Sequence, residues 1–150
     1  MHKKTGLPIK TTLAGILLLV CTLAYAGEKV IAANAWVRPT VPGQEVTGAF
    51  MTLQSKAHAK LIKVESPAAE IVEMHSMSMH NNVMEMRQVD RIDLPAGETV
   101  KLAPGGFHIM LINVKKPLKR GDTVPLKLTI LNDDKSTSIT NVRATVGNKK

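Results

Sequence analysis

Beyond residue 26, apolar and polar residues alternate in short runs, and turn-forming residues separate one run from the next. Alternation with a period of two is typical of a β-strand that is buried on one face, and no segment keeps a helical period over about ten residues. The pattern predicts about nine short strands. Ten segments are candidates for them: 29–37, 47–54, 61–65, 71–79, 83–89, 92–94, 99–102, 107–114, 124–131 and 138–146.

Prolines, glycines and asparagines mark the loops between these strands. Residues 38–43 hold two prolines and a glycine, which cannot continue a hydrogen-bonded ladder, and residues 132–135 predict a hairpin turn. Gly48, inside a predicted strand, indicates a bulge or a point where another group approaches the backbone closely. Many short strands joined by such turns predict an all-β, antiparallel sandwich or small barrel. A chain of 150 residues without repeat or linker predicts a single domain.

The first 26 residues have the features of an export signal. Lys3, Lys4 and Lys10 are followed by an apolar run over residues 13–24, and Ala24-Tyr25-Ala26 is typical of a cleavage site. The run is shorter than the about 20 residues that a membrane span needs. We therefore expect cleavage, no stable membrane insertion afterwards, and a mature protein in the periplasm. The expected organisation is a leader at 1–26, a β domain at 27–146 and a short basic tail at 147–150.

The single cysteine of the chain, Cys21, lies inside this leader. Lipid attachment at Cys21 is an alternative to cleavage after Ala26, although Val20 is bulkier than the residue that normally precedes such a cysteine. Cleavage after Ala26 leaves no cysteine, which excludes disulfides and thiolate metal sites such as blue-copper centres.

Charge and aromatic content argue against a nucleic-acid partner. The chain carries 20 basic and 12 acidic residues, a net charge of +8. Removal of the three leader lysines leaves 17 basic residues and a net charge of +5. The charges are dispersed, and one Tyr, one Trp and two Phe cannot form an aromatic platform for single-stranded nucleic acid.

Residues suited to metal binding gather in two places. Residues 74–86 (MHSMSMHNNVMEM) contain five of the eight methionines and two of the five histidines. Residues 104–110 (PGGFHIM) add His108 and Met110, two positions apart and therefore on one face of a strand. Thioether sulfur and imidazole nitrogen are the ligands that a soft metal ion of low charge prefers, and Cu(I) is the leading candidate.

The spacing within residues 74–86 predicts a hairpin. Asn81 and Asn82 can adopt the positive φ that a two-residue turn requires. This loop sets the cross-strand neighbours: Met79 opposite Met84, Met77 opposite Met86, and His75 diagonal to Met86 on the same face.

Packing is a different explanation of the methionines, because Met is an adaptable core residue and alternate methionines can form one buried face of a strand. Outside the initiator and the two clusters, however, the chain has one further methionine, Met51. Methionines that merely filled gaps would be scattered more evenly, so the clustering favours metal binding.

Four of these residues, His75, Met86, His108 and Met110, follow the spacing H-x10-M-x21-H-x-M. With the flanking segments GAFMTL (48–53), LPAG (94–97) and PLKRGDTVPL (117–126), the pattern resembles the periplasmic copper(I) chaperone family known as PCuAC. The resemblance implies a cupredoxin-like β-sandwich or barrel, Cu(I) held by those four residues, and delivery of copper to the CuA centre of cytochrome oxidase. Residues outside the pattern are expected to line the site, to act as auxiliary ligands or to pack: Met77, Met79, His80 and Met84.

The sequence therefore predicts an exported Cu(I)-binding metallochaperone rather than an enzyme, since nothing in it resembles a nucleophile–base pair. The expected partner is a copper-accepting protein, such as subunit II of cytochrome c oxidase or another copper chaperone. Two alternatives stay open. One is a periplasmic protein for copper buffering or resistance, and the other is a structural exported β-sandwich whose methionine-rich face is core.

Overall fold

The computed structural model describes residues 30–147, and within this range the chain forms ten β-strands and no helix. The strands are β1 (Ile31–Val37), β2 (Val46–Gln54), β3 (Ala59–Glu65), β4 (Ala69–His80), β5 (Val83–Gln88), β6 (Ile92–Leu94), β7 (Thr99–Leu102), β8 (His108–Val114), β9 (Thr123–Asn132) and β10 (Thr137–Val146). The expected leader, with Cys21, and residues 148–150 of the expected tail lie outside the described residues. Among residues 30–147 no helix is long and apolar enough to span a membrane.

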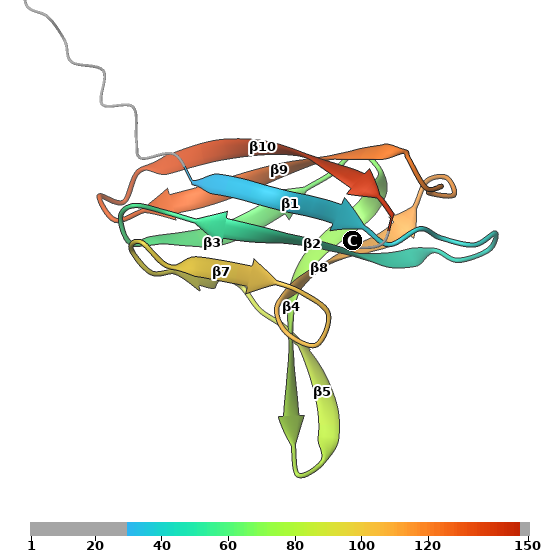
Figure 1. The fold of residues 1–150 in the computed structure, drawn as a ribbon, viewed down its shortest axis with the longest axis horizontal. Helices are drawn as coiled ribbons and strands as arrows, with labels where there is room; N and C mark the ends of the chain where they lie inside the picture. Colours follow the sequence, from blue (N-terminus) through green and yellow to red (C-terminus); the bar gives the residue numbers. More distant parts are fainter. Residues whose placement is uncertain (1–29, 148–150) are drawn as a thin grey trace, which may run out of the picture.

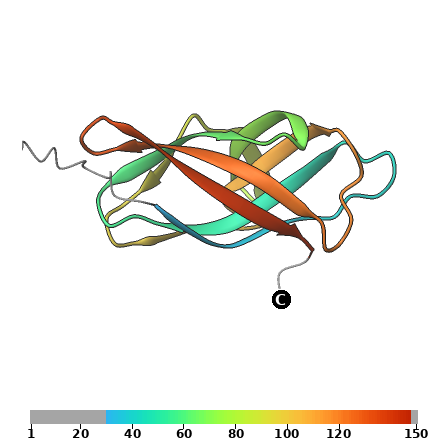
Figure 2. The ribbon, with the colours of Figure 1, turned by 90° about the horizontal axis from the view of Figure 1, so that it is seen from above.

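The strands form one continuous, twisted sheet that folds over itself, so that β9 and β10 lie across β2 (Figure 1, Figure 2). Its order is β5-β4-β8-β2-β1-β10-β9-β3-β6, and β7 pairs with the second half of β2. The all-β prediction is confirmed, and each predicted strand is present with its ends within two residues of the expected ones. All pairs are antiparallel except β1 with β10, which run parallel.

The core lies between the two halves of the folded sheet. Along β9 every second side chain is buried, from Val124 to Ile130, while the residues between them face outward. From the other half, Leu53 of β2 and Ile109 and Leu111 of β8 are fully buried. Because burial of a Leu or Ile side chain contributes about 1.5–3 kcal/mol, this alternating face supplies most of the driving force for the fold. It also determines which side chains of β4 and β8 point outward.

Strands β4 and β5 form a hairpin that projects away from the body of the sheet (Figure 1). Asn81 (φ 48°) and Asn82 (φ 61°) both take the left-handed conformation of a two-residue turn. The predicted register is confirmed, with Met79 opposite Met84, Met77 opposite Met86, and His75 opposite Gln88 and hence diagonal to Met86.

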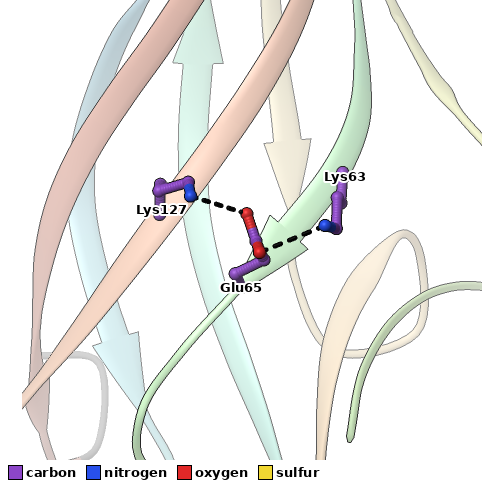
Figure 3. A network of polar contacts seen from close by, with 3 residues as sticks. All are labelled: Lys63, Glu65 and Lys127. Atoms are coloured by element: carbon purple, nitrogen blue, oxygen red, sulfur yellow. Dashed lines mark hydrogen bonds and ion pairs between the residues drawn. The ribbon is translucent and has the colours of Figure 1, made fainter.

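On the surface, β3 and β9 are also linked by charge. Glu65 of β3 lies 3.0 Å from the ammonium of Lys127 on β9 and 3.1 Å from that of Lys63 (Figure 3). Hydrogen bonds from Lys127 and then from Lys63 hold the pKa of Glu65 below its ordinary value. Exposed ion pairs of this kind contribute little to stability, so the buried alternation, and not this network, determines how β3 and β9 are paired.

Replacement of Asn82 by alanine should destabilise the β4–β5 hairpin by about 1 kcal/mol, because alanine tolerates a positive φ less well than asparagine does. Amide hydrogen exchange should become faster in β4 beyond His75 and in β5, while β9 and β10 stay protected. Asn82→Gly is the matched control, since glycine adopts a positive φ without steric cost. Equal exchange in the two variants would contradict the turn assignment.

Candidate metal centre

The candidate residues gather where β4 leaves the body of the sheet. Strand β4 pairs with β8 from Ala69 as far as His75, which lies opposite His108. From His75 to its end at His80, β4 pairs with β5. His75 is therefore the residue at which one pairing ends and the other begins.

Period-two alternation then places the candidates on one face. His75 and Met77 of β4 point to the same side. His108 of β8 is opposite His75, and Met86 of β5 is opposite Met77, so three strands bring their side chains to the same place. Met110, two residues after His108 on β8, shares that face.

His108 has the tighter environment of the two histidines. Its side chain is buried, with 5% of the residue exposed, and its Nδ1–H donates a hydrogen bond to the carbonyl of Gly106 at 3.0 Å. A carbonyl can only accept, so in the neutral ring the free electron pair is on Nε2. Nε2 lies 3.3 Å from Sδ of Met86. Two electron-pair donors this close can share one metal ion, because metal bonds to nitrogen and sulfur are about 2.0–2.3 Å long.

His75 is oriented by a carboxylate. Its Nε2–H donates to Oε2 of Glu73 at 2.8 Å, since an ionised carboxylate can only accept. The other ring nitrogen, Nδ1, is buried and has no hydrogen-bond partner among the described residues. The ring centre is 5.8 Å from that of His108. A buried acceptor without a donor calls for an explanation, and a metal ion that accepts its electron pair provides one.

Methionine sulfur lines the space beside these rings. Met77, Met86 and Met110, together with His108, border a cavity of about 380 Å³. His75 does not line this cavity, but its ring lies beside that of His108, which does. The structure thus brings the four residues of the sequence pattern to one end of the β4–β8 pair, with Met86 accessible at 49% exposure.

An aromatic and cationic stack also borders the cavity, through Phe50 and Arg38. The ring of Phe50 packs against Trp36, with ring centres 4.5 Å apart, and lies 6.4 Å from the ring of His108. The guanidinium of Arg38 lies over the ring of Phe50, 5.4 Å from the ring centre. A Cβ atom on Gly48 would be 2.8 Å from Cζ of Phe50. Gly48 is therefore a point of close approach and not a bulge, and it is what allows the ring to reach His108.

The auxiliary candidates lie farther out on the hairpin. Met79 is 65% exposed and Met84 is 49% exposed. His80 is exposed as well, but it lies opposite Val83 and so points to the other face of the hairpin. The alternative in which the methionine-rich face is core is wrong for these residues, because the buried methionines are Met51 and Met74.

The donors that meet here are neutral sulfur and nitrogen atoms, which suit a soft ion. Among residues 30–147 no three His, Cys, Asp or Glu side chains are grouped so that they could hold a metal ion. A metal at this site would therefore need the methionine sulfurs as ligands. Sequence reasoning missed Glu73 and Gly106 as the groups that orient the two rings. Glu73 could have been found, because it precedes His75 by two positions and so shares its face.

Known proteins resemble this chain along most of its length. A family model described as "Putative lipoprotein LpqE-like" matches residues 30–144. The "Putative lipoprotein Lxx21020" of Leifsonia xyli subsp. xyli (strain CTCB07) is 33% identical over 152 residues, covering 92% of this chain and 89% of its own. The "Uncharacterized protein RP573" of Rickettsia prowazekii (strain Madrid E) is 26% identical over 171 residues, covering 90% and 93%.

Solved structures share the fold. The solution structure of apo-DR1885 from Deinococcus radiodurans matches with a TM-score of 0.60 and 28% identity, covering 97% of each chain. That of CuI-DR1885 from the same organism matches with a TM-score of 0.57 and 32% identity, covering 83% of this chain and 80% of that one. The copper-bound PCuAC domain from PmoF2 has a TM-score of 0.62 at 23% identity, covering 81% and 95%, and shows the fold alone. The cupredoxin-like fold class is confirmed.

Replacement of Gly48 by alanine should lower the free energy of unfolding by about 1–3 kcal/mol, the usual cost of overpacking. The added Cβ would press on a Phe50 ring that Trp36 and Arg38 already hold in place. Urea unfolding measures the change. Gly147→Ala is the control, since nothing lies within 4 Å of its added Cβ. If both variants unfolded at the same urea concentration, the close approach at Gly48 would have no energetic weight.

Proposed function

The chain belongs to the LpqE-like family, and on that premise we propose that it is an exported Cu(I)-binding metallochaperone. His75, Met86, His108 and Met110 hold the copper ion, which is cargo and not a resident cofactor. The protein binds and passes on this ion, and it catalyses no reaction. Its site of action is the periplasm, reached through the export signal of residues 1–26.

The observation that carries the proposal is the contact between Nε2 of His108 and Sδ of Met86. The two atoms are 3.3 Å apart, and the Gly106 carbonyl holds the ring proton on the opposite nitrogen. Without an ion between them, two electron pairs face each other at the edge of the cavity. With a soft cation between them, both pairs are used.

Two further observations support copper as the cargo. The spacing of the four residues resembles that of the PCuAC family. A structurally similar chain at 32% identity, CuI-DR1885 from Deinococcus radiodurans, is named as a Cu(I) form. Thioethers are neutral and need no deprotonation, while thiolates would be lost to oxidation outside the cytoplasm. A His/Met donor set therefore suits Cu(I) in an exported protein.

Accessibility of one ligand gives a route for transfer. Met86 is half exposed whereas His108 is almost fully buried. An incoming thiolate or imidazole of an acceptor can displace the Met86 sulfur first, while His108 still holds the ion. The acceptor would be a copper protein such as the CuA-bearing subunit II of cytochrome c oxidase, or another copper chaperone. Buffering or resistance would use the same site with no dedicated acceptor.

Met86→Leu and Met110→Leu should each weaken Cu(I) binding, because leucine preserves packing but supplies no electron pair. Removal of a group that only hydrogen-bonds to a metal ligand costs about 10–100-fold in affinity. Removal of a ligand itself should cost at least as much. Competition with a Cu(I) chelator measures it. Met74→Leu, a buried methionine on the opposite face of β4, is the matched control and should keep wild-type affinity. Unchanged affinity in both site variants would refute the proposed ligand set.

Glu73→Leu should also weaken Cu(I) binding, by about 10–100-fold, because the His75 ring loses the acceptor that fixes its orientation. Glu73→Gln is the control, since its side-chain oxygen can still accept from Nε2–H. Nitrogen NMR of the His75 ring in the metal-free protein adds a readout independent of copper. A single tautomer should persist in the Gln variant and be lost in the Leu variant. If the Leu variant kept both affinity and tautomer, Glu73 would have no positioning role.

A further inference from the structure

The outer end of the β4–β5 hairpin carries two methionines that neither packing nor the inner site explains. Met79 and Met84 lie directly opposite each other. At 65% and 49% exposure they contribute nothing to the buried core. Large apolar side chains left in water at the end of a projecting hairpin bring no gain in stability, so their pairing calls for a chemical reason.

The two sulfurs continue the face of the inner site. Side chains two positions apart share one face of a strand and are about 7 Å apart along it. Met79 and Met84 therefore form the next cross-strand pair outward from Met77 and Met86. Cross-strand Cβ atoms are about 4.5–5.5 Å apart, and the flexible methionine side chains can bring both sulfurs to one ion.

We propose that Met79 and Met84 form an outer thioether site for a soft monovalent cation, from which the ion enters and leaves the inner site. This inference rests on the proposed function for the inner site. Met77 lies between the two sites, opposite Met86, and borders the inner cavity. An ion can thus pass from the outer pair to Met77 and Met86 and then to His108. At each step one bond to sulfur or nitrogen breaks as another forms, and the ion keeps its charge and oxidation state.

The chemistry of this face selects the kind of ion. Glu85 and Arg87 lie on the other face of β5 and pair with each other at 2.7 Å. His80 also points to that other face. The outer pair thus offers two neutral sulfurs and no carboxylate, so it discriminates against hard divalent cations. With two donors instead of four, it should bind more weakly than the inner site and release its ion readily.

Silver(I), a soft monovalent cation that does not change oxidation state under these conditions, is the probe. Carbon-13 NMR of the methionine methyl groups follows each sulfur while silver(I) is added to the mature protein. The Met86 and Met110 methyl signals should shift over the first equivalent, and those of Met79 and Met84 over the second. The double variant Met79→Leu/Met84→Leu should lose the second phase and keep the first. Val83→Leu, on the opposite face at the hairpin end, is the matched control and should keep both phases.

Loading is tested separately by the rate at which a chelator withdraws Cu(I). The double variant should release copper several-fold more slowly than the wild type, with the affinity of the inner site unchanged. Equal rates would overturn the role in loading and release. Met79 and Met84 signals that do not move beyond the first equivalent would overturn the outer site, while shifts of Met86 and Met110 would leave the proposed function standing. If none of the four signals moved, the proposed function would fail, and this inference with it.

Discussion

The structure depends on the register of a single strand, because β4 is hydrogen-bonded to β8 over its first half and to β5 over its second. Side chains alternate across a strand, so a slip of one residue in either ladder would turn His75 and Met77 to the opposite face. The Gly106 carbonyl secures the junction, since it accepts both the backbone N–H of Met77 at 3.1 Å and the ring N–H of His108 at 3.0 Å. One backbone atom thus ties the hairpin, the loop before β8 and a buried histidine together.

Each of the two histidines presents one free ring nitrogen, but opposite nitrogens and different acceptors are involved. The Nδ1–H of His108 donates a hydrogen bond to a main-chain carbonyl, whereas the Nε2–H of His75 donates one to the side chain of Glu73. Consequently His108 presents Nε2 and His75 presents Nδ1. A carbonyl persists whatever residue occupies its position, while a carboxylate can be replaced. Substitution at residue 106 would therefore not remove the acceptor for the His108 ring. Substitution at residue 73 would change the acceptor for the His75 ring.

Much of this arrangement could be read from the sequence, because it depends on local rules. Asn81 and Asn82 signal a turn with positive φ, and period-two spacing then determines which methionines face one another. Non-local features could not be read in this way. The parallel pairing of β1 with β10 joins the two ends of the domain, and this contact depends on how the whole sheet folds. Gly48 was recognisable as special, but only the position of the Phe50 ring shows that close approach is the reason.

Exposure of the hairpin sulfurs has a consequence for the chemical lifetime of the protein. Oxidants convert accessible methionines to sulfoxides, which are polar and chiral and no longer offer the soft electron pair of a thioether. Met79, Met84 and Met86 stand open to solvent, whereas Met51 and Met74 are shielded in the core. Oxidation would therefore leave the core and the fold intact, while the exposed methionines would lose their thioether sulfurs as soft electron-pair donors. Restoring these thioethers would then require reduction of the sulfoxides.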